Sequence, residues 1–452
     1  MGAANLSAQP RPGIRTLGCV TIVSSQHPRR RRTTVWAGAG DALRAHSRVV
    51  DTTADLLALL PGPEDTLTWV RQGEGIVGWG EAARFEPSGP DRFRLAADWW
   101  RSFADGVDVV DEVGLPGSGL VAFVSMAFAD DPGDSVLVVP EIVVGRRNGV
   151  TWITEIGGDG PSRPTVHPVR PIRTPSAINY SGGQSSAAGY RAAVAKAVHR
   201  LRSTDLAKVV LSHDIVATVP DGDGPIDARY VLTGLADRYP NCYVFSVDGL
   251  LGATPELLLR RHGDTVSARV LAGTMWPTDG VDADALANRL LGSAKNQEEH
   301  RYAVDSLLAT LRPYCAELAA PHDPEILVLP NVVHLATDIR GTLTDDVSLL
   351  TLTGAAHPTA AIGGTPKDAA VALIAELEGM DRGRYTGPVG WVDSTGDGEF
   401  GIALRCGQLD GNSVRLFAGG GIVADSDPDN EVAEAAAKFV PMREALEPLR
   451  EG

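Results

Sequence analysis

The sequence predicts an α+β fold in which large antiparallel β-sheets are flanked by helices. One observation is that strand-like segments come in runs joined by short turns, as in residues 242–273 and 387–423. Another is that helical segments stand between these runs in blocks, whereas a parallel sheet would alternate single strands with single helices. A third is that 43% of the 452 residues are apolar, so the chain can bury a large core.

The first part of the chain divides into a basic leader and a strand-rich segment. Residues 1–40 contain no acidic residue, and residues 29–32 are consecutive arginines. A transit peptide or a nucleic-acid-binding arm has this composition, but we favour a poorly ordered leader without a catalytic role. Residues 41–185 are punctuated by Gly and Pro, and we expect them to form the N-terminal half of a single large domain. Within this half, residues 92–107 have helical spacing.

The second part, residues 186–447, shows clearer elements. The small, polar stretch at about 175–187 that precedes it is typical of a linker or loop. Apolar residues then recur at helical spacing from Tyr190 to Leu201. The remaining expected elements are a strand at 207–219, a hairpin turn at His262–Asp264, an interrupted helix at about 283–318, a helix near 366–378, one strand at 399–409 and a closing helix from about Asp429.

Charge and cysteine content exclude several classes of function. The formal charge is −16, which argues against nucleic acid or an anionic membrane as the main partner. The four cysteines form no CxxC pair, as expected for buried thiols in a reducing compartment, and we expect a cytoplasmic protein. No apolar run reaches the roughly 18 residues of a membrane span. If the substrate is an anion, the protein must build a local positive site against its own net charge.

The stretch "AGGGIVADSDPDNEVAEAAAKF", residues 418–439, is a candidate ion site. Its alternating aspartates suggest a calcium loop. An EF-hand loop that starts at Asp425, however, would need Gly at position 430 and Glu at position 436, where this chain has Asn430 and Ala436. A solvated acidic loop with Asp429 as the helix N-cap explains the aspartates better.

The helix that follows this loop carries Glu431, Glu434 and Lys438 on one face. That face is either a surface ion pair or a metal-binding carboxylate pair with an anion-binding lysine. The preceding glycines would bring backbone N–H groups to the same place.

Nine segments, taken together, resemble one family. Together they span about residues 190 to 445, and no single segment would suffice. They are "LAKVVLSH" (206–213), "GATPELLLR" (252–260), "VLAGT" (270–274), "AKNQEEH" (294–300), "VVHLATDIRG" (332–341), "HPTAAIGGTPKDAA" (357–370), "RGRYTGPVGW" (382–391), "IALRC" (402–406) and "AGGGIVADSDPDNE" (418–431). In this order they resemble the chorismate-utilising enzymes, specifically the isochorismate synthases. The resemblance implies an anthranilate synthase component I-like fold and makes residues 186–447 the chorismate-binding catalytic region.

The resemblance also implies roles for the ionisable residues. It makes Lys208 the general base that activates water, and Glu256 the general acid that protonates the leaving C4 hydroxyl. The base needs a lowered pKa and the acid a raised one. Glu299 and Glu434 resemble the family's Mg²⁺ ligands, and Glu431 contributes directly or through water.

The substrate-binding positions follow from the same resemblance. Arg405 and Tyr385 would clamp the enolpyruvyl carboxylate, since arginine makes planar, bidentate contacts with carboxylates. Lys438 and the N–H groups of two glycines would add positive potential. His334 is either a pocket residue or a satisfied core histidine. The remaining pocket positions are Gly420, Gly421, Ala272, Gly273, Thr274 and Ala361.

Two positions suggest which member of the family this is. Aminating relatives tend to lack a lysine at position 208, and one branch carries a nucleophilic lysine where Ala272 stands, so Lys208 with Ala272 indicates water as the nucleophile. Salicylate synthases tend to have threonine where Ala361 stands, which favours a reaction that stops at isochorismate. We therefore expect a monomeric, Mg²⁺-dependent isochorismate synthase for menaquinone or siderophore biosynthesis. A salicylate synthase and a non-catalytic binding subunit are the alternatives.

Overall fold

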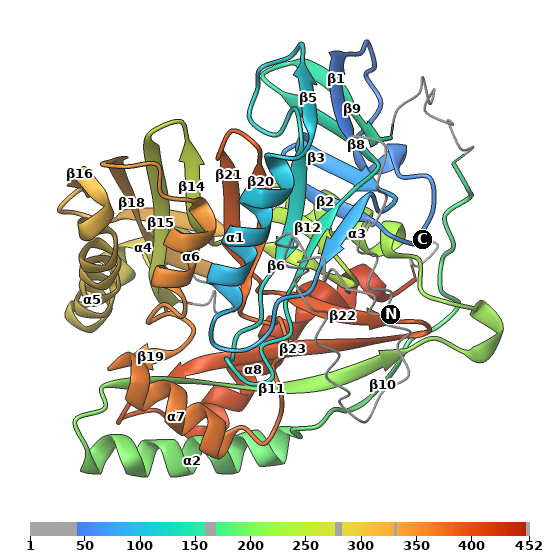
Figure 1. Ribbon diagram of the computed structural model, residues 1–452. Helices are drawn as coiled ribbons and strands as arrows, with labels where there is room; N and C mark the ends of the chain where they lie inside the picture. The colour runs from blue at the N-terminus through green and yellow to red at the C-terminus, as the bar shows by residue number, and fades with distance from the viewer. Residues whose placement is uncertain (1–42, 159–168, 276–282, 330–331, 449–452) are drawn as a thin grey trace, which may run out of the picture. The chain divides into compact units, whose positions relative to one another are not determined.

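The protein is described by a computed structural model that covers residues 43–158, 169–275, 283–329 and 332–448. The predicted leader, residues 1–40, lies outside the described residues. The α+β prediction is confirmed, because two large sheets and their flanking helices account for the described chain (Figure 1). All strand pairs between described residues are antiparallel except β1 with β5. No helix in these ranges is long and apolar enough to cross a membrane.

The larger sheet combines strands from both parts of the chain. Its order is β10 (Asn179–Gly182), β11 (Lys208–Thr218), β23 (Ser413–Ile422), β22 (Cys406–Asp410), β13 (Leu250–Thr254), β12 (Tyr243–Val247), β2 (Leu67–Arg71), β3 (Glu74–Trp79), β8 (Ile142–Arg147), β9 (Val150–Gly157), β1 (Arg44–Val49) and β5 (Asp108–Asp111), with β19 (Gly364–Thr365) paired to β11. β12 pairs with β2, so the strand-rich N-terminal segment continues the sheet that carries β11 and β23.

The smaller sheet is built in the same way. Its order is β16 (Cys315–Ala319), β18 (Val332–Leu343), β15 (Thr265–Met275), β14 (Leu257–His262), β21 (Gly398–Ile402), β20 (Pro388–Asp393), β6 (Val121–Ser125), β7 (Val136–Val139) and β4 (Ala83–Phe85), with β17 (Glu325–Leu329) paired to β18. The two sheets are joined by side chains: the indole N–H of Trp69 on β2 donates to Glu399 on β21 at 2.9 Å.

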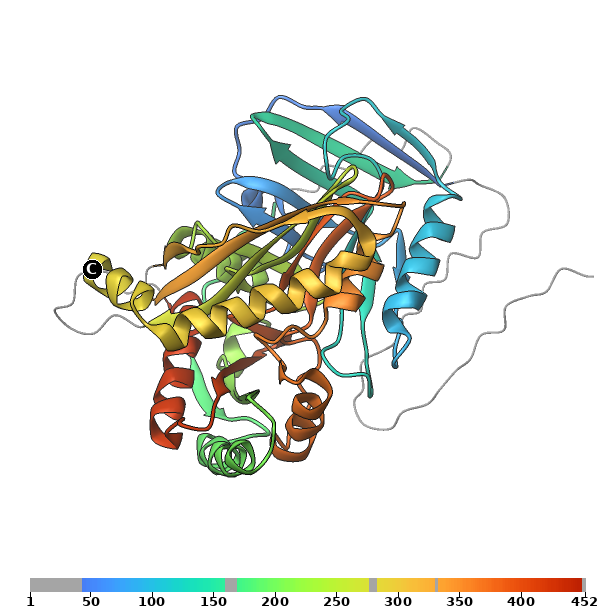
Figure 2. The ribbon, with the colours of Figure 1, turned by 90° about the vertical axis from the view of Figure 1, so that its left-hand side faces the viewer.

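Helices cover the sheets on the sides that carry apolar residues. They are α1 (Arg92–Ala104), α2 (Ala187–Ser203), α3 (Ala228–Arg238), α4 (Ala283–Leu291), α5 (Ala294–Leu311), α6 (Leu349–Ala356), α7 (Lys367–Leu377) and α8 (Pro428–Leu446). α2 and α8 pack on β11 and β23, where the ring of His213 lies 4.9 Å from Tyr190 and 5.1 Å from Phe439. α5 runs along the strands of the smaller sheet (Figure 2) and packs on β15.

The expected interruption of the helix at 283–318 is confirmed, because the segment forms α4 and α5. Four other expectations from the sequence need correction. This helix ends at Leu311, before 318, because Pro313 lacks the N–H that a further turn needs. Residues 179–182, expected in a linker, form β10, because their backbone pairs with the end of β11. The N-cap of α8 is Asp427, whose Oδ1 accepts from the N–H groups of residues 429 and 430.

The fourth correction concerns the strand expected at 399–409. It is two strands in different sheets: β21 ends at Ile402 in the smaller sheet and β22 begins at Cys406 in the larger one. The connecting residues, Ala403 to Arg405, therefore cross from one sheet to the other. Arg405 has a φ of +48° there, an unusual conformation for a residue with a side chain.

Candidate active site

Lys208 and Glu299 meet although they are 91 residues apart in the chain. Lys208 opens β11, and Glu299 lies in the second turn of α5, whose N-terminus is capped by the hydroxyl of Ser293. The Lys208 Nζ donates to Glu299 Oε1 at 2.6 Å, and the lysine side chain is only 17% exposed. Lys208 is therefore not a strand-edge lysine that faces water.

Gly421 on β23 makes room for the Lys208 side chain. It pairs with Val210, so it lies beside the start of β11. A Cβ added to Gly421 would lie 2.5 Å from the Lys208 Cε and 3.1 Å from its Nζ. Any side chain at position 421 would displace the amine, which explains why this position needs glycine.

Gly420 makes room for two carboxylates of α8 in the same way. A Cβ at this position would lie 3.0 Å from Glu431 Oε2 and 3.6 Å from Glu434 Oε1, so the two oxygens converge over the bare glycine. Carboxylate oxygens are the ligand type that a hard divalent cation prefers. By their chemistry, these two residues therefore fit Mg²⁺.

Two lysines accompany these carboxylates. The Lys438 Nζ donates to Glu434 Oε1 at 2.6 Å and to the carbonyl of Gly419 at 2.8 Å. Burial lowers the pKa of Lys438, although Glu434 opposes the effect. No three His, Cys, Asp or Glu side chains in the described ranges converge closely enough to hold a metal ion as they stand. Lys208 and Lys438 instead contact oxygens of Glu299 and Glu434.

The ladder between β11 and β23 determines where the glycine N–H groups point. The N–H of Val210 donates to the carbonyl of Gly363, away from β23, so Val210 and Gly421 form a non-hydrogen-bonded pair. Gly421 therefore turns its N–H away from β11, to the side on which Lys438 reaches the Gly419 carbonyl. Gly420 is the alternate position, and its N–H belongs to the ladder with Leu211.

Glu256 is buried at the point where the chain enters β14, with 9% of its surface exposed. Desolvation raises the pKa of Glu256 to about 7, and the nearby charges of Lys208 and Arg405 only partly oppose the shift. A carboxyl group with this pKa is about half protonated at pH 7, so it can donate a proton near neutral pH, as a general acid requires.

Arg405 lies on the sheet-to-sheet crossing, and its burial lowers the pKa of the guanidinium. Tyr385 is 4% exposed and stacks on Phe417 of β23 with ring centroids 4.9 Å apart. Burial raises the pKa of Tyr385 to about 12, so it remains a neutral hydrogen-bonding group. Holding Arg405 at positive φ costs on the order of 1–3 kcal/mol, and such backbone strain is most common at functional sites.

His334 lies across from Thr274 in the pairing of β18 with β15. This pairing is interrupted at Gly273, whose φ is +72° and which forms a bulge between Ala272 and Thr274. Burial, with the charges of Arg405 and Lys438, lowers the pKa of His334 to about 3, so the ring is neutral. The carbonyl of Ala272 lies 3.1 Å from His300 Nδ1, which ties β15 to α5.

Ala361 lies in the loop between α6 and α7. It lines a cavity of about 130 Å³ that Glu256 and Gly364 also line. Ala361 and Glu256 thus line the same cavity. No contact between Ala361 and the carboxylates of α8 is observed among the described residues.

Two supporting residues were not singled out from the sequence. His300 is buried and bridges the Ala272 carbonyl and the Thr337 hydroxyl, the latter at 2.7 Å, one residue after Glu299. Arg382 is 3% exposed, pairs with Glu378 and donates to the carbonyl of Val210 at 2.8 Å. A Glu and an Arg four apart beside the "RYTGP" motif are visible in the sequence, but their burial is not.

The fold and this arrangement define a class of protein: an α+β enzyme whose largely antiparallel sheets and flanking helices carry an acid, an amine and several carboxylates. The chain belongs to the family described as chorismate binding enzyme, which matches residues 167–447. It is therefore an enzyme that acts on chorismate.

Individual relatives agree with this assignment. The chain is 38% identical over 270 residues to isochorismate synthase DhbC of Bacillus subtilis, covering 57% of this chain and 67% of that one. It is 41% identical over 256 residues to isochorismate synthase EntC of Escherichia coli, covering 55% of this chain and 64% of that one. The solved structure of MenF, the menaquinone-specific isochorismate synthase of Escherichia coli, shares the fold: its TM-score is 0.74 at 24% identity, over 90% of this chain and 95% of that chain.

Proposed function

We propose that this protein is an isochorismate synthase, an isomerase that adds water to C2 of chorismate and expels the C4 hydroxyl with the help of Mg²⁺. The observation that carries the proposal is the pairing of opposite chemistries in one site. Glu256 is a carboxyl group whose pKa is about 7, and its pKa is influenced by the nearby amine of Lys208. An acid for the leaving hydroxyl and a base for water are the two proton-transfer groups that the reaction needs.

Each residue has a defined task in this proposal. Lys208 takes the proton of the attacking water, and Glu256 gives its proton to the departing C4 hydroxyl. Lys208 donates to Glu299 at 2.6 Å, whereas in this proposal Glu299 would bind Mg²⁺ and Lys208 would face the attacking water. The proposal therefore requires Glu299 to release Lys208 when the site is loaded.

The carboxylates and cations would hold the substrate from two sides. Glu299, Glu434 and Glu431 would hold Mg²⁺, which when bound supplies a Lewis acid for the ring carboxylate and draws electron density from the diene. Arg405 and Tyr385 would hold the enolpyruvyl carboxylate. Lys438 and the N–H of Gly421 would add positive potential on the same side of β23.

The choice of product rests on two small residues. Ala272 leaves no amine on β15 that could act as a nucleophile. Ala361 offers no hydroxyl in the cavity that it shares with Glu256, which favours release of isochorismate over elimination of pyruvate. We also propose that the product is used for menaquinone or siderophore biosynthesis. In the same proposal, the protein acts as a monomer in the cytoplasm.

Incubation of the purified protein with chorismate and Mg²⁺, followed by chromatography, tests the proposal. Isochorismate as the main product supports it. Salicylate with pyruvate would make the protein a salicylate synthase. Anthranilate that forms only with ammonia would contradict both assignments. Calorimetry that detects no Mg²⁺ binding, with or without chorismate, would favour a non-catalytic binding subunit.

A further inference from the structure

A second cavity, of about 590 Å³, lies between the two sheets and is lined by basic side chains. We name it the arginine cavity and define it by Arg71, Tyr243, Arg260, His262, Arg269 and Arg340. Its volume is in the range of sites for small organic molecules, roughly 300–1,000 Å³, and exceeds what a single inorganic ion needs.

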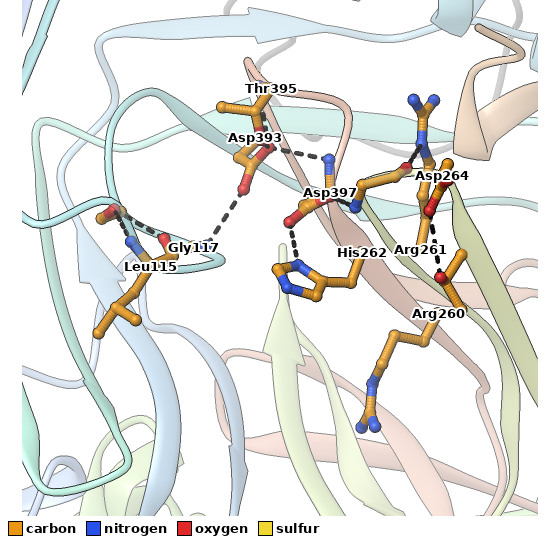
Figure 3. A network of polar contacts seen from close by, with 12 residues as sticks. Leu115, Gly117, Arg260, Arg261, His262, Asp264, Asp393, Thr395 and Asp397 are labelled. Carbon is orange, nitrogen blue, oxygen red and sulfur yellow. Dashed lines mark hydrogen bonds and ion pairs between the residues drawn. The ribbon is translucent and has the colours of Figure 1, made fainter.

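Strand register brings three of these residues together. Arg260 on β14 pairs with Ser267 on β15, which pairs in turn with Arg340 on β18, so the row crosses three neighbouring strands. Arg269 lies two residues beyond Ser267 and therefore faces the same side of the sheet. Arg260 and His262 likewise share one side of β14, while Arg261 between them points the other way (Figure 3).

The larger sheet supplies the opposite wall. The phenol oxygen of Tyr243 on β12 accepts from Arg71 at 3.3 Å and from Arg260 at 2.9 Å. Two guanidinium groups are thus held at one oxygen atom. The Nε of Arg71 is buried and has no hydrogen-bond partner among the described residues. A buried donor without an acceptor is costly. This atom is not accessible to solvent, however, so a ligand in the cavity would meet the terminal N–H groups of Arg71 instead.

The cations of this cavity outnumber its acids. Asp338 is the one acidic residue in the described lining, and Arg269 already holds it through two bonds of 2.6 and 2.7 Å. Glu399, behind the cavity, is shared between Arg147 and Arg260. Neither Arg71 nor Arg340 contacts a carboxylate in the described part of the chain.

His262 lies at the rim of the cavity. His262 Nδ1 lies 2.6 Å from Asp397 Oδ2 (Figure 3), which leaves Nε2 of the ring for other contacts. Asp397 also accepts from the N–H of Gly263, so the turn that carries His262 is fixed in place.

The cavity is separate from the site for chorismate. None of the residues that we assign to the acid, base, metal or clamp lines it. Arg340 is six residues from His334 along β18, a distance of roughly 20 Å at about 3.4 Å per residue. The two sites are nevertheless linked through the chain, because Pro255 and Leu257, on either side of Glu256, line the arginine cavity.

We propose that the arginine cavity binds a small organic oxyanion, a carboxylate or phosphate ester, at a site distinct from that of chorismate. Guanidinium groups suit such ligands because their paired N–H groups match two oxygens of a carboxylate or phosphate. This proposal does not depend on the proposed reaction. An experiment can therefore disprove the oxyanion site while the isochorismate synthase activity is confirmed, or the reverse.

Calorimetry on the full-length protein, at constant ionic strength set with chloride, tests the proposal. The probes are succinate for the carboxylate arm and glycerol phosphate for the phosphate arm. We expect saturable, one-site binding of at least one probe, and the arm that binds identifies the ligand class. Arg340→Gln should weaken this binding at least fivefold. Arg71→Gln should also weaken it at least fivefold, because Arg71 is a lining cation that contacts no carboxylate in the described part of the chain.

Two controls make the result decisive. Arg101→Gln removes an exposed arginine of α1 outside the cavity and should leave probe binding unchanged. Probe binding to the Lys208→Ala variant should be the same with and without chorismate. The proposal is overturned if neither probe binds, if Arg101→Gln and Arg340→Gln weaken binding equally, or if chorismate displaces the probe.

Discussion

Replacing Glu256 by glutamine should change the pH dependence of stability as well as the activity. Burial raises the pKa of Glu256 from 4.5 to about 7, so the folded protein binds this proton more tightly than the unfolded chain does. The stability that the group contributes is therefore lost as pH rises from about 4.5 to 7. Glutamine carries no titrating proton and removes this dependence.

The magnitude follows from the size of the shift. One pKa unit corresponds to about 1.4 kcal/mol, so a shift of about 2.5 units amounts to roughly 3 kcal/mol at pH 8, where both states are mostly ionised. At pH 5 the same difference is below about 1 kcal/mol. Relative to wild type, Glu256→Gln should therefore gain about 2–3 kcal/mol in free energy of unfolding between pH 5 and pH 8. Any packing effect of the amide is the same at both pH values and cancels in this comparison.

Urea unfolding followed by fluorescence of the eight tryptophans, at pH 5 and pH 8, measures this difference. Glu317→Gln, on an exposed position of β16, is the matched control and should show no such difference. The same Glu256→Gln protein should lose on the order of 10²–10⁴-fold in kcat, because an amide cannot donate the acid's proton. Equal stability changes at both pH values would mean that Glu256 is already ionised in the folded protein, and would refute its role as the acid.

Three further substitutions test the site. Lys208→Ala should keep the thermal midpoint of unfolding but lose about 10²–10⁴-fold in turnover with chorismate. The control variant Lys196→Ala should retain activity. Unchanged turnover of Lys208→Ala would exclude Lys208 as the base. Gly421→Ala should fold and yet lower kcat at least tenfold, since its Cβ would lie 2.5 Å from the Lys208 Cε; normal kinetics would show that the amine is not held there. Glu434→Gln should weaken Mg²⁺ binding at least tenfold in calorimetry. The control variant Asp425→Asn, in the exposed acidic loop, should bind Mg²⁺ as the wild type does. If only Asp425→Asn weakens binding, the metal lies in the loop.

The fold class was predictable because strand runs and blocks of helices are local patterns. The boundary between β21 and β22 was not predictable, because the apolar residues at 399–409 have the pattern of one continuous strand, although they belong to two sheets. Only the crossing at Ala403–Arg405 assigns the two halves to different sheets, and that crossing depends on partners more than 100 residues away, such as β13.

The parts of the site differ in the same way. Glu434 and Lys438 share a helical face, so their contact follows from spacing alone. Lys208 and Glu299 were named through resemblance, but their contact depends on how α5 packs against the sheets. The burial that raises the pKa of Glu256 likewise needs the tertiary structure, because the sequence shows only two neighbouring leucines.

The arginine cavity was invisible in the sequence for a related reason. Arg260, Arg269 and Arg340 are separated along the chain and read as ordinary polar positions of alternating strands. They share one wall only because β14, β15 and β18 pair in the observed register, and a shift of one residue would turn each to the other face.

The net charge of −16 does not exclude anionic ligands, because the cations of the site are largely withdrawn from solvent. Screening at physiological salt limits the effect of exposed acids to about 8 Å, whereas buried charges are screened much less. Arg405 and Lys438 act from such buried positions, and both influence the pKa of His334 across the site. A ligand in this space is attracted mainly by the nearest guanidinium and ammonium groups. The arginine cavity, the second anion site that we propose, likewise depends on a few cations, and the register of β14, β15 and β18 fixes the positions of three of them.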